Sequence, residues 1–263
     1  MIGAIVYELR AENSARLPFI NGRFMHAAFF KILNDNSPAL GKFIHNELNI
    51  KPFTVSFLDP LKEIPHFEDK WIVRRGDKFF WRVTGLKSEI LDAAKNVSAG
   101  CQVQAGALTL KVEEIRVEAV VSTDDFIAEI KNAPPVCEIC FDFVSPVSFR
   151  IDTFDAPYPR AELIFSSLAD KWTQAAMPAE VDKKIIRELA EKIRLTQWQG
   201  QSKKFYFAHD RGTLAFWGKF FYNLEDLSST ARKIFHLLAE FGEFSGVGRL
   251  TGQGFGQTRV NCQ

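Results

Sequence analysis

The spacing of apolar residues alternates between a two-residue period and a helical period, and the same series occurs twice along the chain. Apolar residues from 2 to 10 predict a strand, and near-helical spacing follows from 22 to 33. Ser37 and Pro38 are typical of an N-cap and a first helical residue, so we expect a second helix reaching about residue 48. The chain therefore begins with a strand and a pair of helices.

The rest of the first half predicts strands around one further helix. We expect a strand over 53–58, a hairpin or strand pair over 71–83, a helix over 86–97 and strands over 101–121. With the two early helices counted as one crossover, the order is β-α-β-β-α-β, which is the ferredoxin-like arrangement.

Pro134 and Pro135, together with the polar stretch before them, predict a domain boundary, after which the order recurs. The second series consists of strands over 137–151, helices over 158–173 and 178–193, strands over 205–208 and 213–222, a helix over 227–241 and a strand over 257–261. The sequence thus predicts an α+β protein of two tandem ferredoxin-like (RRM-like, β-α-β-β-α-β) domains, residues 1–131 and 136–263.

Composition narrows the class of protein only slightly. The chain has 263 residues, of which 46% are hydrophobic and 25% charged, as in soluble globular proteins. Its net charge is +1, so a basic surface has to be local. We see no signal peptide or membrane span and expect a cytoplasmic protein without a membrane partner. The 25 phenylalanines predict sheet cores rich in aromatic rings.

The four cysteines do not predict a disulfide framework. Cys137 and Cys140 have C-x-x-C spacing, but no second pair or nearby histidine completes a zinc site. They lie in a predicted strand, where residues three apart point to opposite faces. We expect these two to be small buried residues, and we expect no metal and no cofactor.

Residues 246–256 (GVGRLTGQGFG) are the most informative stretch, because five of the 16 glycines fall within these eleven residues. Glycine permits positive φ and close approach of another chain, so backbone amides can turn toward an anion. A nucleotide-cofactor loop is disfavoured, because the run follows a helix and lacks a Gly-Lys-Ser/Thr ending. By composition alone, a loop that contacts a polyanion and a flexible hinge both remain open.

The glycine pattern G-x-G-x-x-T-x-x-G-F-G, placed after the last helix of a second ferredoxin-like unit, resembles the CRISPR-associated endoribonuclease family that processes precursor CRISPR RNA. Residues 141–149 (FDFVSPVSF) and 159–168 (PRAELIFSSL) are similar to the opening strand and helix of that family's second domain. Residues 26–30 (HAAFF) and 37–45 (SPALGKFIH) resemble its first helix pair. The resemblance covers most of the chain.

The resemblance implies cleavage of CRISPR repeat RNA without a metal ion. The 2′-hydroxyl beside the scissile phosphate attacks it and leaves a 2′,3′-cyclic phosphate and a 5′-hydroxyl. This chemistry needs a base, an acid and a cation near the phosphorus, and histidine can act as acid or base near neutral pH. The sequence shows no dense Asp/Glu/His cluster, and this agrees with cleavage without a metal ion.

The resemblance places the family's catalytic histidine at His45, at the end of the second helix. Lys51 matches a lysine of some members and is expected to stabilise charge on the phosphate. Phe30 stands where some members have tyrosine, and His26 lies one helical turn before it. We hypothesise that His26 supplies the missing polar function, with a packed, structural histidine as the alternative. For His45 the alternative is an inert surface histidine at a helix end. For Lys51 the alternative is a solvated lysine without a catalytic role.

RNA contacts are expected from the glycine run and from a basic hairpin. The predicted RNA-binding residues are Gly246, Gly248, Arg249, Gly252, Gly254, Gly256, Lys203, Lys204 and Arg211. Most aromatic rings of the hairpin are expected in the sheet core rather than as stacking platforms. We assign no chemistry to His66, His209 or His236.

Two other functions stay open at this stage. One is a non-cleaving RNA-binding subunit of the same superfamily, and the other is an unrelated ferredoxin-like enzyme whose glycine loop binds a small anion. Beside CRISPR repeat RNA, candidate partners are a CRISPR effector complex and a second copy of the chain.

Overall fold

The computed structural model describes the backbone of residues 1–47, 50–208 and 211–263, and the side chains of these residues except 45–47, 207, 208 and 211. The chain forms two compact units. The first comprises Met1–Val120 with Gly252–Gly254, and the second comprises Val121–Thr251 with Phe255–Gln263. Among the described residues, no helix combines the length and the apolar character needed to cross a bilayer.

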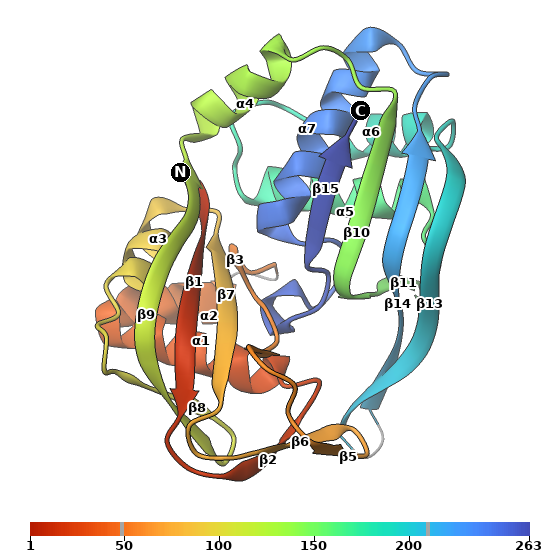
Figure 1. Cartoon of the computed structure of the whole chain (residues 1–263). Coiled ribbons are helices and arrows are strands. Elements are labelled where there is room, and N and C mark those ends of the chain that lie inside the picture. The colour runs from red at the N-terminus through yellow and green to blue at the C-terminus, as the bar shows by residue number, and fades with distance from the viewer. Residues whose placement is uncertain (48–49, 209–210) are drawn as a thin grey trace. The chain divides into compact units, whose positions relative to one another are not determined.

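The first unit is built on one main sheet with the strand order β3-β7-β1-β9-β8 (Figure 1). Its elements are β1 (Ile2–Ala11), β2 (Ala15–Pro18), α1 (Gly22–Asn36), α2 (Pro38–Glu47), β3 (Phe53–Val55), β4 (Asp59–Pro60), β5 (His66–Phe67), β6 (Lys70–Val73), β7 (Lys78–Gly85), α3 (Ser88–Lys95), β8 (Gln102–Ala105) and β9 (Leu108–Val121). β4 also pairs with β7, and β2, β6 and β5 form a separate small sheet. The order of β1, β3, β7 and β9 confirms the predicted ferredoxin-like arrangement.

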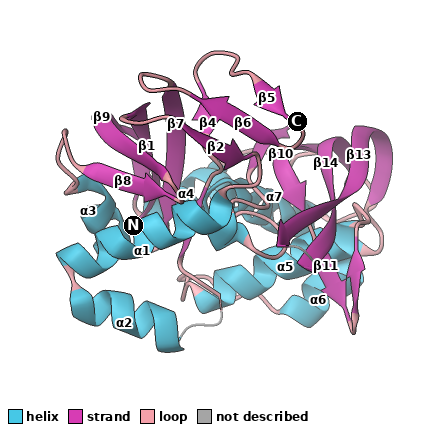
Figure 2. Cartoon of the chain, turned by 90° about the horizontal axis from the view of Figure 1, so that it is seen from below, coloured by secondary structure: helices cyan, strands magenta, loops and turns pink. Residues whose placement is uncertain are grey.

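Alternate residues along the strands of this first sheet are buried, and they form its inner face. In β7, Phe79, Trp81 and Val83 are buried, and the residues between them are more exposed. In α1, Met25, Phe29 and Leu33 are buried one helical turn apart and form the face that covers the sheet. Figure 2 shows α1 and α3 together on one side of the strands of this unit.

The second unit repeats the arrangement with the sheet order β13-β14-β10-β15. Its elements are α4 (Thr123–Asn132), β10 (Glu138–Val147), β11 (Phe149–Ile151), β12 (Phe154–Ala156), α5 (Ala161–Gln174), α6 (Lys183–Ala190), β13 (Arg194–Ala208), β14 (Arg211–Asn223), α7 (Ser229–Ser245), the 3-10 turn η1 (Thr251–Gln253) and β15 (Thr258–Cys262). α5 and α7 lie on one face of the four strands (Figure 1). Both units therefore have the predicted β-α-β-β-α-β order.

Several elements differ from the sequence prediction, and the short strands β2, β4, β5 and β12 were not expected. The predicted strand over 205–208 is the end of β13, which begins at Arg194. Residues 194–199 are exposed, so they carry no apolar alternation by which a strand could be recognised. The helix α4 was also missed. It begins at the N-cap Ser122, whose side chain accepts a hydrogen bond from the amide of Asp125, and it groups with the second unit.

Two further expectations are wrong. The strands within 71–83 do not form a hairpin, because β6 pairs with β2 and β5 whereas β7 pairs with β1, β3 and β4. Cys137 is exposed and Cys140 is half-buried, so these two thiols are not the core residues that were expected; Cys101 is exposed and Cys262 half-buried. All four are free, as expected from the absence of a disulfide framework.

Candidate active site

His26 lies on α1 in the first unit, with its ring between aromatic side chains and the centre of the glycine run. The ring is half-buried, and its centroid is 4.8 Å from that of Phe30 and 5.7 Å from that of Phe53. Nδ1 of His26 lies 2.6 Å from the carbonyl oxygen of Gly252, a residue 226 positions away. The predicted catalytic histidine and the predicted RNA-binding loop therefore meet.

This contact fixes the tautomer of the His26 ring. A carbonyl oxygen can only accept, so Nδ1 carries the hydrogen and donates it to Gly252. In the neutral ring, Nε2 then holds the lone pair and is the nitrogen that can take a proton. Packing against Phe30 and Phe53 also fixes the plane of the ring. The His26 ring therefore has a fixed orientation and is not a freely rotating surface histidine.

The glycine run lies close to its neighbours in the first unit, which explains why positions 22 and 254 are occupied by glycine. A Cβ on Gly22, the first residue of α1, would lie 1.8 Å from the carbonyl oxygen of Gln253. A Cβ on Gly254 would lie 2.4 Å from the ring of Phe57, and Gly254 has a φ of +90°. A side chain at Gly22 would separate α1 from the run, and one at Gly254 would separate the run from Phe57. Gly252 differs, because its Cβ would make ordinary contact, at 3.5 Å, with the His26 ring.

Lys51 lies near the helical turn that carries His45. Its Nζ donates to the carbonyl oxygen of Ile44, 2.8 Å away, and Ile44 directly precedes His45 in α2. Burial lowers the pKa of Lys51 from its usual value. The backbone of His45 belongs to α2, as predicted, but its side chain lies outside the described residues. His26 and Lys51 are thus placed in the first unit, and the orientation of His45 stays a prediction.

The two ends of the glycine run are held within the second unit by backbone hydrogen bonds. The amide of Val247 donates to the carbonyl of Gly256, and the amide of Gly256 donates to that of Pro146, each at 2.8 Å. The amide of Gly248 donates to Oγ of Ser167 at 3.0 Å. These amides are used internally. Gly246, Gly248 and Gly256 also have φ values of +64°, +76° and +70°, respectively, which explains the choice of glycine.

A buried lysine that the sequence analysis missed anchors the same run. Lys171 on α5 donates to the carbonyl oxygens of Ser245 and Gly246, at 3.0 and 2.8 Å, and contacts Oγ1 of Thr251 at 3.3 Å. Burial lowers its pKa to about 7. Lysine is rarely buried without partners, and here three acceptors surround the nitrogen. Its position in an amphipathic helix gave no signal, because one lysine among helical polar residues looks like solvated surface.

The candidate RNA-binding cations differ in their surroundings. Nη1 of Arg249 is 2.9 Å from Oδ1 of Asp155, so this guanidinium already has an acidic partner. Lys203 and Lys204 are exposed on β13, and Nζ of Lys204 lies 5.3 Å from the ring centroid of Tyr206. The side chain of Arg211 lies outside the described residues. The exposed lysines and the exposed Tyr206 form a basic, aromatic strand edge.

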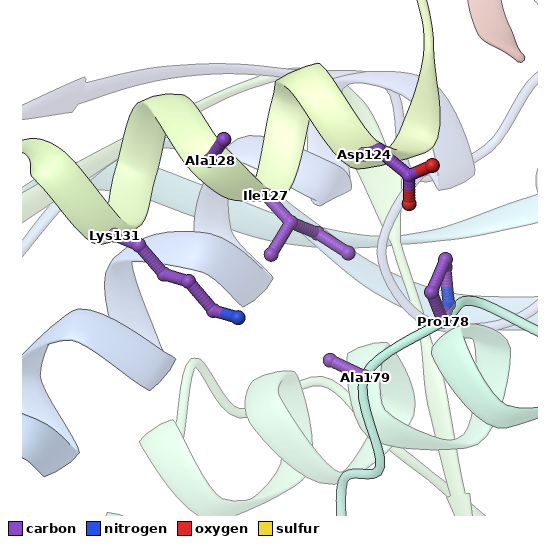
Figure 3. A pocket seen from close by; sticks show the side chains of 6 residues that line it. All are labelled: Asp124, Ile127, Ala128, Lys131, Pro178 and Ala179. Carbon is purple, nitrogen blue, oxygen red and sulfur yellow. The ribbon is translucent and has the colours of Figure 1, made fainter.

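Two cavities in the second unit are lined by residues outside the predicted catalytic set. One, of about 220 Å³, lies between α4 and the segment joining α5 to α6, and its lining includes Ile127, Lys131 and Pro178 (Figure 3). The other, of about 380 Å³, is lined by residues of β10, β14 and β15, including Lys219 and Arg259. Neither lining contains a predicted catalytic residue. The candidate chemistry therefore depends on the environment of His26 in the first unit, not on either cavity.

Comparison with known families accounts for both halves of the chain. A family model described as the CRISPR Cas6 N-terminal domain matches residues 1–123, and one described as CRISPR-associated endoribonuclease Cas6 matches residues 141–258. The chain belongs to the Cas6 family. The endoribonuclease class and the family predicted from the glycine run and the helix pair are thereby confirmed.

Relatives in sequence and structure agree with this assignment. A CRISPR-associated endoribonuclease Cas6 of Mycobacterium tuberculosis is 25% identical over 231 residues, which cover 84% of this chain and 71% of that protein. A Cas6 product complex is 26% identical with a TM-score of 0.78, covering 99% of this chain and 100% of the other. A Thermus thermophilus Cas6 is 25% identical with a TM-score of 0.69, covering 99% and 98% of the two chains. Membership of the family makes this chain an endoribonuclease that processes CRISPR RNA.

Proposed function

We propose that this protein cleaves the CRISPR repeat in the precursor transcript without a metal ion. A base removes the proton of the 2′-hydroxyl, and the 2′-oxygen then bonds to the adjacent phosphorus. The bond from phosphorus to the 5′-oxygen breaks, and an acid gives that oxygen a proton. The products are a 2′,3′-cyclic phosphate and a 5′-hydroxyl, so the reaction consumes no water and needs no redox partner.

The contact between His26 and the glycine run is the observation that carries this proposal. It holds an imidazole with a defined tautomer at a loop expected to bind RNA. We assign His45 and His26 to the acid and base roles and Lys51 to stabilising charge on the phosphate. Support for Lys51 is its bond to the carbonyl of Ile44, beside His45, since this places a cation near that histidine.

The cleavage test is a single-turnover assay on repeat RNA in EDTA. We expect one cut, its loss when the nucleotide before the cut is 2′-deoxy, and a loss of about 10²- to 10⁴-fold in rate for His45→Ala. His66→Ala is a matched control, because His66 is an exposed histidine of the same unit in the small sheet. Full activity of His45→Ala would remove that residue from the mechanism, and loss of cleavage in EDTA would contradict metal independence.

RNA binding is assigned to the glycine run with Arg249, and to the hairpin lysines Lys203 and Lys204 with Arg211. Exposure of the lysines and the nearby Tyr206 ring support this, because cations position the phosphates and rings can stack on unpaired bases. The ion pair of Arg249 with Asp155 implies that phosphate would compete with that carboxylate.

The binding test replaces Lys203 and Lys204 together by alanine. We expect weaker repeat binding and a smaller dependence of affinity on salt, while the rate for fully bound RNA stays near that of the original protein. Lys183→Ala with Lys184→Ala is the matched control, since these adjacent lysines lie on α6. RNA that binds normally but is never cut would favour the non-cleaving subunit, and failure to bind at low salt would favour a small-anion enzyme.

Two partners and a location accompany this function. An effector complex would receive the cut RNA, and a second copy of the chain would form a homodimer, which sedimentation with and without repeat RNA tests. A cytoplasmic location follows from the proposed substrate, a newly made transcript.

A further inference from the structure

Three metal-binding side chains converge in the second unit, far along the chain from the catalytic histidines. His236 and Glu240 are four residues apart on α7, and Cys262 is the last residue of β15. One potential ligand atom from each lies within 4.8 Å of the others. Nε2 of His236 is 3.7 Å from Oε1 of Glu240. Within the described part of the chain, these are the residues grouped in this way.

The set has the chemistry of a zinc site. Imidazole, carboxylate and thiolate are the three ligand types that Zn²⁺ combines, whereas Mg²⁺ and Ca²⁺ avoid sulfur. Zinc bonds of about 2.0–2.3 Å require ligand atoms about 3.3–3.8 Å apart in a tetrahedron. The pair His236 and Glu240 already has that spacing, and the thiol sulfur of Cys262 lies within 4.8 Å of a ligand atom of each. Glu240 is 30% exposed, so water can reach a fourth position.

The ring of His236 has one nitrogen, Nε2, that faces Glu240 and one, Nδ1, that faces no polar partner among the described residues. Nδ1 of His236 is buried and has no hydrogen-bond partner among the described residues. Such orphaned buried nitrogens are uncommon.

We propose that His236, Glu240 and Cys262 bind one Zn²⁺ ion that joins α7 to β15. These elements directly flank the glycine run, since α7 ends at Ser245 and β15 begins at Thr258. The ion therefore stabilises the frame from which the run is held, and takes no part in cleavage. The proposal is independent of the proposed function, because it concerns metal uptake and stability rather than RNA.

The test is titration of the full, chelator-stripped chain with Zn²⁺ against a chromogenic competitor. Cys101→Ser with Cys137→Ser serves as the parent protein, because both of these thiols are exposed and could bind metal nonspecifically. We expect one equivalent per chain, and a rise in Tm of roughly 5 °C at saturation. Co²⁺ in place of Zn²⁺ should give thiolate-to-metal charge-transfer absorption.

Adding Cys262→Ser or His236→Gln to that parent should abolish the Co²⁺ absorption and lower the affinity at least tenfold. Far-UV circular dichroism shows whether these variants fold. If a variant does not fold, Glu240→Gln, at a more exposed position, provides the same comparison. Unchanged stoichiometry in the variants, or no uptake at micromolar Zn²⁺, overturns the proposal. Cleavage that continues in EDTA while Tm falls agrees with it, and loss of cleavage without a change in uptake would count against the RNA mechanism alone.

Discussion

The helix that follows the opening strand of the main sheet in each unit, α1 after β1 and α5 after β10, supplies a nitrogen that holds the glycine run, but the two nitrogens have different surroundings. In the first unit, His26 of α1 donates to Gly252 from a half-buried position. In the second, Lys171 of α5 is buried and donates to Ser245 and Gly246. Equivalent helices of one topology thus carry a half-buried imidazole and a fully buried amine at the run, and burial is the main difference between the two groups.

The largest expected effect is on the cleavage rate, and it tests the role of His26 in this comparison. His26→Asn keeps an N–H donor for Gly252 but removes the titratable ring, so the single-turnover rate should fall by about 10²- to 10⁴-fold. The melting temperature should change little, because the hydrogen bond is kept. A full rate for His26→Asn would make His26 a structural residue.

On the Lys171 side the loss should be in stability. Lys171→Met leaves three buried acceptors without this donor and should lower the free energy of unfolding by roughly 2–4 kcal/mol, measured by urea denaturation. Lys183→Met is the control, because the Lys183–Asp170 pair is largely exposed and should contribute less than about 1 kcal/mol. Equal losses in the two variants would contradict the anchoring role.

Substitutions inside the run sharpen the comparison further. Gly254→Ala should cost about 1–3 kcal/mol, because its φ is +90° and the added methyl meets Phe57. Gly252→Ala should stay within about 0.5 kcal/mol, because its Cβ makes ordinary contacts. Thermal unfolding of both variants measures the difference, and a larger loss for Gly252→Ala would show that the packing of the run has been misassigned.

A further effect is a pH dependence, which is gradual along the pH scale. The pKa of Lys171 is about 7 in the folded chain and 10.5 as the ordinary value, so between these limits the unfolded chain binds the extra proton. The free energy of unfolding should therefore rise with pH from 7 to 10.5, and by up to about 1.4 kcal/mol per unit relative to Lys171→Met. Below pH 7 both states are protonated and the difference should level off. A flat difference across this range would contradict the lowered pKa.

Much of the fold was predictable because it depends on local pattern. Alternating burial in β7 and helical spacing in α1 follow directly from the order of apolar residues. β13 was mostly missed, because the exposed residues 194–199 are held in a strand by pairing with β14 rather than by burial. The pairing of β6 was mispredicted for a related reason, since sequence adjacency to β7 favoured a hairpin that the sheets do not form.

The candidate site, like the fold, was predictable only in part from the sequence. The sequence by itself determined the repeated order of elements, the glycine run and the residues worth testing, because composition and spacing are properties of neighbouring positions. Tertiary structure alone decided that Gly252 meets His26, that Lys171 is buried and that His236 and Glu240 lie beside Cys262. Each of these depends on which distant segments pack together, and long-range packing is set by the whole core rather than by the period of any one segment.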